Sequence, residues 1–316
     1  MFLKTSIATV EQFQNLFGDQ FQTNVTLSRY TSARVGGPAE MYLTVKSASE
    51  LQTAVELAYA RRIPYFILGG GSNILVSDRG ISGLVIMNKA KAVKYRSNGV
   101  NIICTVESGM NLSSLARQCI GKGLGGLEWA IGIPGTVGGA VIGNAGAHGA
   151  DMSSNLLAAQ VWEPGRGVRM YSQEEMRYAY RDSILKREQG KNLSRRVVLA
   201  AELELKPEPV DILTARANAF NSHRKQTQPG GASTGSMFKN PENYYAGYLI
   251  DTAGLKGLRF GGATISEKHA NFFMNEDNAS AEDIRSLIAE AWNSVREQFG
   301  VEMELEVELV GDWDFD

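Results

Sequence analysis

Ser236 is the residue whose type and neighbours best suit it to act as an acid. It lies in the run 233–241, three residues before Lys239. A serine hydroxyl has a high intrinsic pKa, so it donates a proton only where neighbours stabilise the alkoxide, and Lys239 is a candidate for that task. The spacing alone favours a plain turn built on serine and threonine hydroxyls. The acid is therefore a hypothesis that needs support from other residues.

Arg181 is the candidate group for holding a carboxylate. It follows the aromatic residues Tyr178 and Tyr180, and its planar guanidinium matches the two oxygens of a carboxylate. A surface ion pair with the adjacent Asp182 is the alternative, and it is favoured when Arg181 is considered alone.

Four glutamates alternate along the last predicted strand: Glu302, Glu304, Glu306 and Glu308. A period of two places them on one face of the strand. Four carboxylates on one face repel one another unless they meet cations or solvent. Either the face is solvated, or one glutamate at the end of the strand enters a site.

Two glycine-rich stretches predict where a large ligand lies against the main chain. The run 132–149 is dense in glycine and carries no Asp, Glu, Lys or Arg, which a globular chain tolerates where backbone passes close to something or takes positive φ. The turn Gly69-Gly70-Gly71-Ser72-Asn73 joins two predicted strands, and successive N–H groups there can form a nest for phosphate oxygens. A tight turn is the alternative. Together the stretches suit a dinucleotide cofactor.

Other motifs carry no chemistry. The G-x-G-x-x-G match at 121–126 follows a predicted helix, whereas a dinucleotide fingerprint follows a strand. His148, His223 and His269 are too scattered for metal-ligand spacing, so we expect no metal. Cys104 and Cys119 are expected to be buried free thiols, with a disulfide as the alternative.

The composition describes an ordinary globular protein. Its 316 residues favour about two domains, and a net charge of −2 favours neither nucleic acid nor an anionic membrane surface. We find no secretory signal and no apolar run of about 18 residues. We therefore expect a cytoplasmic protein.

The elements that must position these residues follow from periodicity and turn signals. Leu112–Ile120 is expected to end at Gly121 as the C′ glycine, and 228–240 is expected to be a loop. The proline pair at 207–209 is a candidate linker. We expect helices over 1–22, after a capping box at 47–50, and over 112–120, 210–225 and 281–299, and strands over 64–68, 74–76, 84–86, 93–96, 100–106, 160–162, 168–170, 197–205 and 301–310.

Six blocks in this order resemble the UDP-N-acetylenolpyruvoylglucosamine reductases, flavoenzymes of bacterial cell-wall precursor synthesis. The resemblance covers about 26–311, and its blocks are 34–39, 69–76, 132–149, 180–183, 235–241 and 266–272. It implies an α+β protein with a vanillyl-alcohol-oxidase-type (PCMH-type) FAD-binding fold of two subdomains, 1–90 and 91–209. A third α+β domain, 210–316, would bind the substrate, with the last residues able to return to the first subdomain.

The resemblance also implies a reaction and its partners. FAD would be bound noncovalently and reduced by NADPH, and hydride would then pass from flavin N5 to C3 of the enolpyruvyl group of a UDP-sugar. We expect a monomer with no nucleic-acid or membrane partner. The resemblance assigns FAD binding to Gly69, Gly70, Gly71, Ser72, Asn73, Gly132, Ile133, Pro134, Gly135, Gly138, Gly139, Asn144 and Ala145.

The same resemblance assigns the catalytic roles. Ser236 would protonate C2, Arg181 would sit at the substrate carboxylate, and Glu306, five residues before Gly311, would be the essential glutamate. Glu304 is the weaker alternative to Glu306. Contacts to the UDP diphosphate and sugar are expected from Arg224, Lys239 and Asn240.

Some positions depart from the family pattern. The stretch 230–234 lacks the usual proline, and His148 stands where an aromatic residue is common. The span from Arg181 to Ser236 is too short for the extra tyrosine-bearing loop of one branch, which places the chain in the branch without it. The basic segment 186–196 has no explanation from sequence. Two rivals remain, another flavin oxidase of the same fold and a noncatalytic nucleotide-binding module.

Overall fold

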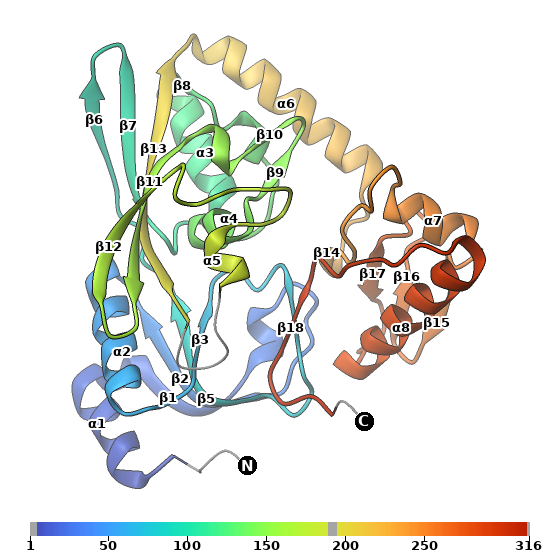
Figure 1. Cartoon of the computed structure of the whole chain (residues 1–316), viewed down its shortest axis with the longest axis horizontal. Coiled ribbons are helices and arrows are strands. Elements are labelled where there is room, and N and C mark those ends of the chain that lie inside the picture. The colour runs from blue at the N-terminus through green and yellow to red at the C-terminus, as the bar shows by residue number, and fades with distance from the viewer. Residues whose placement is uncertain (1–4, 189–194, 315–316) are drawn as a thin grey trace. The chain divides into compact units, whose positions relative to one another are not determined.

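The computed structural model describes residues 5–188 and 195–314. The chain forms two compact units, each built from three stretches of sequence (Figure 1). Unit 1 comprises Met1–Thr23, Met41–Gly69 and Gly83–His223, and unit 2 comprises Asn24–Glu40, Gly70–Ser82 and Arg224–Asp316. The expected three domains are a different division of the chain and stay a prediction.

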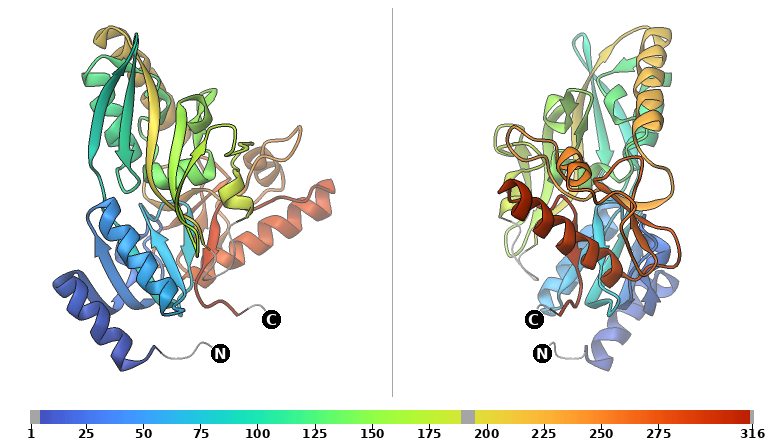
Figure 2. Two further views of the ribbon diagram at one scale, coloured as in Figure 1. Left: turned by 60° about the vertical axis from the view of Figure 1, so that its left-hand side comes forward. Right: turned by 90° about the vertical axis from the view of Figure 1, so that its right-hand side faces the viewer.

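The larger sheet of unit 1 is antiparallel, in the order β12-β11-β13-β7-β6, with β8 beside β13 (Figure 2). The strands predicted over 93–96 and 100–106 form the hairpin β6–β7, and those predicted over 160–162 and 168–170 form the hairpin β11–β12. Helices α3 and α4 bury apolar side chains against this sheet in one core. The strands are β6 (Val93–Asn98), β7 (Asn101–Glu107), β8 (Leu124–Gly125), β11 (Leu156–Glu163), β12 (Gly167–Ser172) and β13 (Val197–Pro207), and the helices are α3 (Leu112–Gly121) and α4 (Val137–Gly143).

A second sheet has the order β1-β2-β5-β3, with β3 parallel to β5. Ser47 caps α2 as predicted, accepting a hydrogen bond from the Glu50 N–H. The Glu50 carboxylate accepts instead from the Lys46 N–H, at 2.7 Å, so only half of the predicted capping box forms. The elements are α1 (Ile7–Phe17), β1 (Phe21–Thr26), β2 (Pro38–Val45), α2 (Ala48–Ala60), β3 (Tyr65–Leu68) and β5 (Ile81–Asn88).

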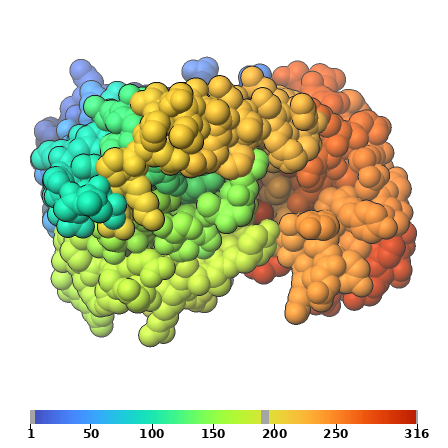
Figure 3. Space-filling view, turned by 90° about the horizontal axis from the view of Figure 1, so that it is seen from above, coloured from blue at the N-terminus to red at the C-terminus, as the bar shows by residue number. Residues whose placement is uncertain are grey.

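Helix α6 (Val210–Thr227) is confirmed close to its expected bounds. Within unit 1 it buries Leu213 and Ala217 in the core of the larger sheet, and its other side is exposed at the surface (Figure 3). The remaining short elements of unit 1 are β9 (Gly146–Ala147), β10 (Ala150–Asp151), α5 (Ile184–Arg187) and the 3-10 turns Gly18–Gln20, Glu128–Ala130 and Met152–Ser154.

Unit 2 contains a four-stranded antiparallel sheet in the order β14-β17-β16-β15. Helix α8 (Ala281–Phe299) packs on this sheet and contributes to its core together with α7 (Ala246–Thr252). Strand β18 (Glu308–Val310) pairs in parallel with β4 (Ile74–Val76). The other strands are β14 (Ala232–Ser236), β15 (Arg259–Phe260), β16 (Ala263–Ile265) and β17 (Phe272–Asn275), and Leu27–Tyr30 is a 3-10 turn.

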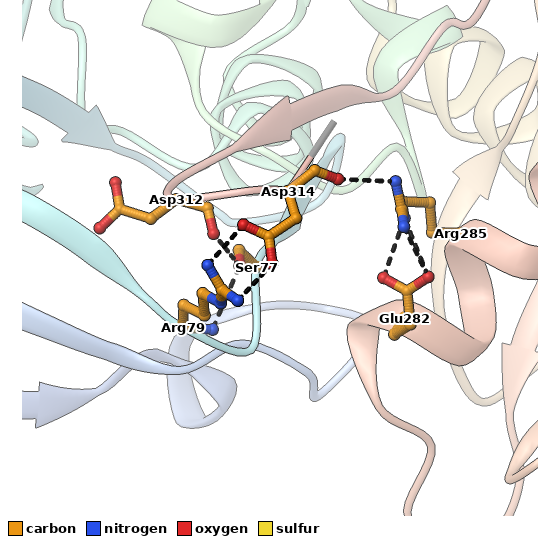
Figure 4. Close-up of polar contacts among 6 residues, drawn as sticks. All are labelled: Ser77, Arg79, Glu282, Arg285, Asp312 and Asp314. Atoms are coloured by element: carbon orange, nitrogen blue, oxygen red, sulfur yellow. Dashed lines mark hydrogen bonds and ion pairs between the residues drawn. The ribbon is translucent and has the colours of Figure 1, made fainter. Parts of the chain in front are cut away.

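The segment 311–314 is tied to the turn after β4 and to the start of α8 (Figure 4). Ser77 Oγ donates to the Asp312 carbonyl at 2.8 Å, and Arg79 forms an ion pair with Asp314. Arg285, which also pairs with Glu282, donates to the Asp314 carbonyl at 3.1 Å. Elements far apart in sequence therefore close unit 2.

Four local predictions are wrong. Helix α1 ends at Phe17 because Gly18 takes φ 53°. Helix α3 continues through Gly121, and the left-handed glycine that follows it is Gly123, at φ 69°. The expected loop 228–240 contains β14, which pairs with β17. Of the expected strand 301–310, only Glu308–Val310 is a strand, and the segment before it is fixed by an isolated bridge between Leu305 and Phe238.

Cys104 and Cys119 are buried free thiols, as predicted. No helix in the described part of the chain is long and apolar enough to cross a membrane.

Candidate active site

Ser236 ends β14 in unit 2, directly opposite Phe272 of β17. Gly235 before it takes φ 81°, and the pairing of β14 with β17 is irregular between Ser233 and Ser236. A glycine is suited to that conformation, since L side chains rarely adopt it. The irregularity redirects the chain at the candidate acid.

The residues after Ser236 are held on both sides by main-chain hydrogen bonds. The Met237 N–H donates to the Asn271 carbonyl at 2.8 Å, and the Glu306 N–H donates to the Met237 carbonyl at 2.9 Å. The Lys239 N–H donates to the Glu304 carbonyl at 2.8 Å. Two of the predicted sequence blocks, 235–241 and 266–272, therefore meet the glutamate segment 304–306 next to Ser236.

Asn271 is the side chain that fixes this segment, and its role was not foreseen from sequence. Its amide donates to the Phe238 carbonyl at 2.8 Å, and its Oδ1 accepts from the Phe238 N–H at 2.9 Å. Asn271 is 3% exposed. The only sequence signal was its place in the block 266–272, because a side chain that pairs with both groups of a distant residue leaves no local pattern.

Replacing Asn271 with alanine should lower the free energy of unfolding by about 2–4 kcal/mol, since two buried main-chain groups of Phe238 lose their partner at about 1–3 kcal/mol each. Urea denaturation of the variant and the parent protein measures the change. A difference below about 0.5 kcal/mol would show that water replaces both bonds and that Asn271 does not hold the segment.

Lys239 does not have the partner that the sequence predicted. Its ammonium lies 2.5 Å from Glu304 Oε1, and its side chain is 14% exposed. The structure therefore gives no support to the hypothesis that Lys239 stabilises the Ser236 alkoxide. Asn240 is also used internally, because its Oδ1 accepts from the Ala246 N–H at the start of α7, at 3.1 Å.

Glu306 differs from the other three alternating glutamates. It is half-buried, whereas Glu302, Glu304 and Glu308 are exposed. Asn73 Nδ2 donates to the Glu306 carbonyl at 2.9 Å. The contrast favours Glu306 over Glu304 as the glutamate that enters a site. The hydrogen bond to Glu306 also gives Asn73 a structural role that the phosphate-nest hypothesis did not include.

The triple-glycine turn has a packing explanation for two of its glycines. Gly71 takes φ 58°, and a Cβ there would lie 2.2 Å from the Tyr30 carbonyl oxygen. A Cβ on Gly69 would lie 2.6 Å from Thr136 Oγ1 within unit 1. The tight-turn alternative therefore accounts for Gly69 and Gly71 without a ligand.

The glycine run of unit 1 folds into α4 and its flanking turns. Thr136 caps the helix, accepting from the Gly139 N–H at 3.4 Å, and Asn144 ends it in the left-handed conformation, at φ 43°. A Cβ on Gly138 would lie 2.9 Å from Ser108 Cβ, so packing requires that glycine. A Cβ on Gly139 would contact only Thr136 Oγ1, at 3.7 Å, and one on Gly143 would contact nothing within 4 Å.

The open space at Gly139 and Gly143 is the feature that fits a cofactor. Neither position is closed by protein atoms, Gly139 is exposed, and Gly132 and Gly135 hold positive φ of 76° and 113°. Such backbone admits a flat ligand without side-chain obstruction. These residues fit a dinucleotide such as FAD.

The turn that carries Arg181 is docked on α4. Tyr178 Oη donates to the Val141 carbonyl at 2.9 Å, and Ser183 Oγ donates to the Ile142 carbonyl at 2.6 Å. Asn144 Nδ2 donates to the Ala179 carbonyl at 3.0 Å. Burial raises the pKa of Tyr178. The turn of the candidate arginine is therefore bound to the glycine run within unit 1.

Arg181 holds a strained backbone conformation, with φ 55°, which non-glycine residues rarely adopt. Its guanidinium carbon lies 5.5 Å from the centre of the Tyr180 ring. Asp182, which the sequence offered as an alternative partner of Arg181, forms an ion pair with Arg187. Backbone strain of this kind concentrates at functional sites.

His148 stands where an aromatic residue is common in the family, and its ring makes an aromatic stack. Its ring stacks on Phe220, with centres 4.3 Å apart and planes 8° apart. Arg224, the expected diphosphate contact, is half-buried, and burial lowers its pKa.

The basic segment 186–196 lies partly outside the described residues, since 189–194 are not described. Its described arginines bind neighbouring groups of unit 1: Arg187 pairs with Asp182, and Arg196 pairs with Glu163 and Glu188. Among the residues that the structure covers, no group of three or more His, Cys, Asp or Glu could hold a metal ion.

Comparisons with known proteins cover most of the chain. Residues 39–169 match the family described as FAD binding domain, and residues 226–310 match UDP-N-acetylenolpyruvoylglucosamine reductase, C-terminal domain. A UDP-N-acetylenolpyruvoylglucosamine reductase of Chloroflexus aggregans is 40% identical over 287 residues, covering 91% of this chain and 96% of that protein. One of Nostoc sp. is 41% identical, covering 93% and 87%.

The crystal structure of the corresponding reductase from Thermus caldophilus is 38% identical in sequence. It superposes with a TM-score of 0.76, covering 90% of this chain and 97% of that one. The expected α+β flavin-binding fold is confirmed by this likeness and by the match to the FAD binding domain.

Proposed function

This chain belongs to the UDP-N-acetylenolpyruvoylglucosamine reductase family, and from that membership we propose that it reduces the enolpyruvyl group of UDP-N-acetylenolpyruvoylglucosamine to give UDP-N-acetylmuramate. It is an FAD-dependent oxidoreductase that uses NADPH as reductant. The observation that carries the proposal is the meeting of the family blocks 235–241 and 266–272 with the glutamate segment 304–306 beside Ser236 in unit 2.

When bound, FAD supplies the hydride that the substrate receives at C3. Gly139 and Gly143 are the residues whose open backbone best fits the cofactor, and Gly132, Gly135 and Ala145 flank them. Ile133, Pro134, Gly138 and Asn144 shape the same run, and we assign the turn Gly69-Gly70-Gly71-Ser72-Asn73 to the pyrophosphate. For Gly69, Gly71, Gly138, Asn73 and Asn144, internal packing or bonding is a second reason for the residue type.

A pair of neighbouring substitutions separates packing from cofactor binding. Gly139→Ala should keep the stability of the apoprotein or raise it by about 0.5–1 kcal/mol, because alanine favours helix, yet lower the FAD content of the purified protein. Gly138→Ala should destabilise the apoprotein by about 1–3 kcal/mol, because its Cβ meets Ser108. Flavin absorbance per protein and the apoprotein melting temperature are the measurements. Full FAD retention in Gly139→Ala would exclude this backbone from the cofactor site.

The catalytic roles follow from the charge that the reaction creates. Addition of hydride at C3 spreads negative charge onto the substrate carboxylate, and we assign its stabilisation to Arg181. We assign delivery of the proton to C2 to Ser236, with Glu306 assisting on the same side of the reaction. The half-burial of Glu306 supports this choice over Glu304, whose carboxylate binds Lys239.

Arg224 is the first candidate to bind the UDP diphosphate, since a half-buried guanidinium suits an anion. Lys239 and Asn240 stay candidates, although Glu304 and the start of α7 already engage them. We place the enzyme in the cytoplasm as a monomer without nucleic-acid or membrane partners. Size-exclusion chromatography with light scattering tests the oligomeric state.

The decisive experiment follows NADPH oxidation by the purified holoenzyme at 340 nm, with and without UDP-N-acetylenolpyruvoylglucosamine. We expect oxidation to depend on that substrate. Oxygen-dependent oxidation of an alcohol or sugar without consumption of NADPH would identify a different flavin oxidase. A purified protein without a flavin absorbance band would favour the noncatalytic module.

A further inference from the structure

The two cysteines of the chain lie together in the core of unit 1, and the roles assigned so far use neither of them. Cys104 is in β7 and Cys119 is in α3, and both are 0% exposed. Each thiol has the other as a hydrogen-bond partner. Two thiols in contact can lose two hydrogens and form a disulfide, a reaction that a single buried thiol cannot undergo.

Tyr95 covers the thiol pair. It lies directly opposite Cys104 in the β6–β7 hairpin, and its hydroxyl is 3.8 Å from Cys119 Sγ. Its strand, β6, is the edge strand of the larger sheet, and most of its residues are exposed (Figure 1). A strand with few buried side chains opens at a low free-energy cost. A small oxidant can therefore reach the thiols when Tyr95 moves aside.

The surroundings of the pair make Cys119 the more reactive thiol. The hydrogen bond with Cys104 lowers the pKa of Cys119, although burial opposes the change, and the charge of Lys122 acts in the same direction as the hydrogen bond. The same hydrogen bond, together with burial, raises the pKa of Cys104. Lys122 Nζ lies 5.4 Å from the centre of the Tyr95 ring. Because the thiolate is the form that attacks an oxidant, Cys119 should react first.

The segment 104–119 joins the thiol pair to the glycine run of unit 1. Four hydrogen bonds of 2.8–3.1 Å connect the middle of this segment to the run: Ser108 with Gly138, Met110 with Val137, Leu112 with Gly135, and Ser113 with Gly132. A bond between Cys104 and Cys119 would close the segment into a covalent loop. That loop would hold the run at its middle.

We propose that Cys104 and Cys119 form a reversible disulfide when a hydroperoxide oxidises them. The Cys119 thiolate attacks one oxygen of hydrogen peroxide, the O–O bond breaks, and the second oxygen leaves as hydroxide and takes up a proton to give water. The sulfur of Cys104 then attacks the resulting sulfenic acid, loses its proton and displaces a second water as the S–S bond forms. Two thiols and one peroxide thus give one disulfide and two waters, and a dithiol reductant reverses the change.

The disulfide should make the protein release FAD more slowly. The cross-link restricts the opening of the segment that holds the glycine run, and this run is the proposed wall of the cofactor site. The effect on FAD therefore rests on that assignment, whereas formation of the disulfide does not depend on the proposed function.

The first test treats the reduced, FAD-loaded enzyme with hydrogen peroxide, alkylates the remaining thiols in denaturant and analyses the tryptic peptides by mass spectrometry. We expect the peptides of Cys104 and Cys119 to be linked to each other, and dithiothreitol to restore both thiols. Parent protein whose two cysteines are still fully alkylated after peroxide treatment would overturn the proposal.

Single substitutions test the order of the two steps. Cys104→Ser should accumulate a sulfenic acid at Cys119, which dimedone traps, and Cys119→Ser should leave Cys104 reduced under the same treatment. The reverse pattern would overturn the assignment of Cys119 as the attacking thiol.

Tyr95→Ala tests the cover of the pair. It should speed disulfide formation about tenfold, because access limits the rate of thiol oxidation at a buried site. Lys94→Ala is the matched control, since Lys94 is exposed and lies on the opposite face of the same strand. Equal rates in the two variants would show that Tyr95 does not control access.

The link to the cofactor is tested by FAD release in mild urea, followed by flavin fluorescence. Release should slow severalfold in the oxidised parent protein and stay unchanged in peroxide-treated Cys104→Ser. A disulfide that forms without changing FAD release would overturn the link to the glycine run.

Discussion

Replacing Ser236 with alanine is expected to stop turnover while leaving flavin reduction intact. The substitution removes only the hydroxyl, and the main chain around it stays held by Asn271 and Glu306. Loss of a general acid lowers kcat by about 10²–10⁴-fold. Because the acid acts after the cofactor has been reduced, the NADPH half-reaction should keep its parent rate.

Stopped-flow absorbance separates the two half-reactions of the Ser236→Ala variant. Flavin bleaching by NADPH should be unchanged, and reoxidation by the enolpyruvyl substrate should slow by the full factor. Ser233→Ala is the control, because Ser233 lies on the same strand and is paired with Met274 on the same face. Normal reoxidation in Ser236→Ala, or an equal loss in Ser233→Ala, would remove Ser236 from the role of acid.

Replacing Arg181 with glutamine is expected to lower kcat by about 10²–10³-fold, the usual cost of losing one preorganised group that stabilises developing negative charge. The side chain keeps its length and loses its charge. Only the half-reaction with the enolpyruvyl substrate should slow, because no carboxylate charge develops when NADPH reduces the flavin.

The same turn supplies the control for Arg181. Arg187 pairs with Asp182 and donates to the Arg177 carbonyl at 2.7 Å, so Arg187→Gln loosens the turn without touching the proposed carboxylate site. Stopped-flow rates of both variants should differ by at least tenfold. Equal losses would assign the effect of Arg181 to the shape of the turn and not to its charge.

The sequence predicted those parts of the fold that local patterns encode. The hairpin at β6–β7 has a glycine at its turn, and α8 carries an N-cap serine and apolar residues at helical spacing, so both are close to their predicted bounds. The segment before β18 was predicted as part of a strand over 301–310. Its tertiary partner, Phe238, fixes it through an isolated bridge to Leu305 instead.

The site was predicted less evenly than the fold. Ser236 was placed by the block 235–241 and Glu306 by its distance from Gly311, and they lie within one main-chain network in unit 2. The left-handed conformations of Arg181 and Asn144 were not predicted, because nothing in a short sequence window forces a non-glycine residue into positive φ. Their causes are tertiary, such as the three hydrogen bonds that Asn144 makes with Asp151, Ala179 and Ser153.

The bond from Asn73 to the Glu306 carbonyl joins residues that are made early and late in the synthesis of the chain. The two residues are 233 positions apart, and a ribosome adds about 5–20 residues each second. On the order of ten to fifty seconds therefore pass between the synthesis of Asn73 and the synthesis of Glu306. During that interval the strand 74–76 has no β18 beside it, and an unpaired strand edge is a target for aggregation. We expect nascent chains halted before residue 306 to be the form of this protein that chaperones bind.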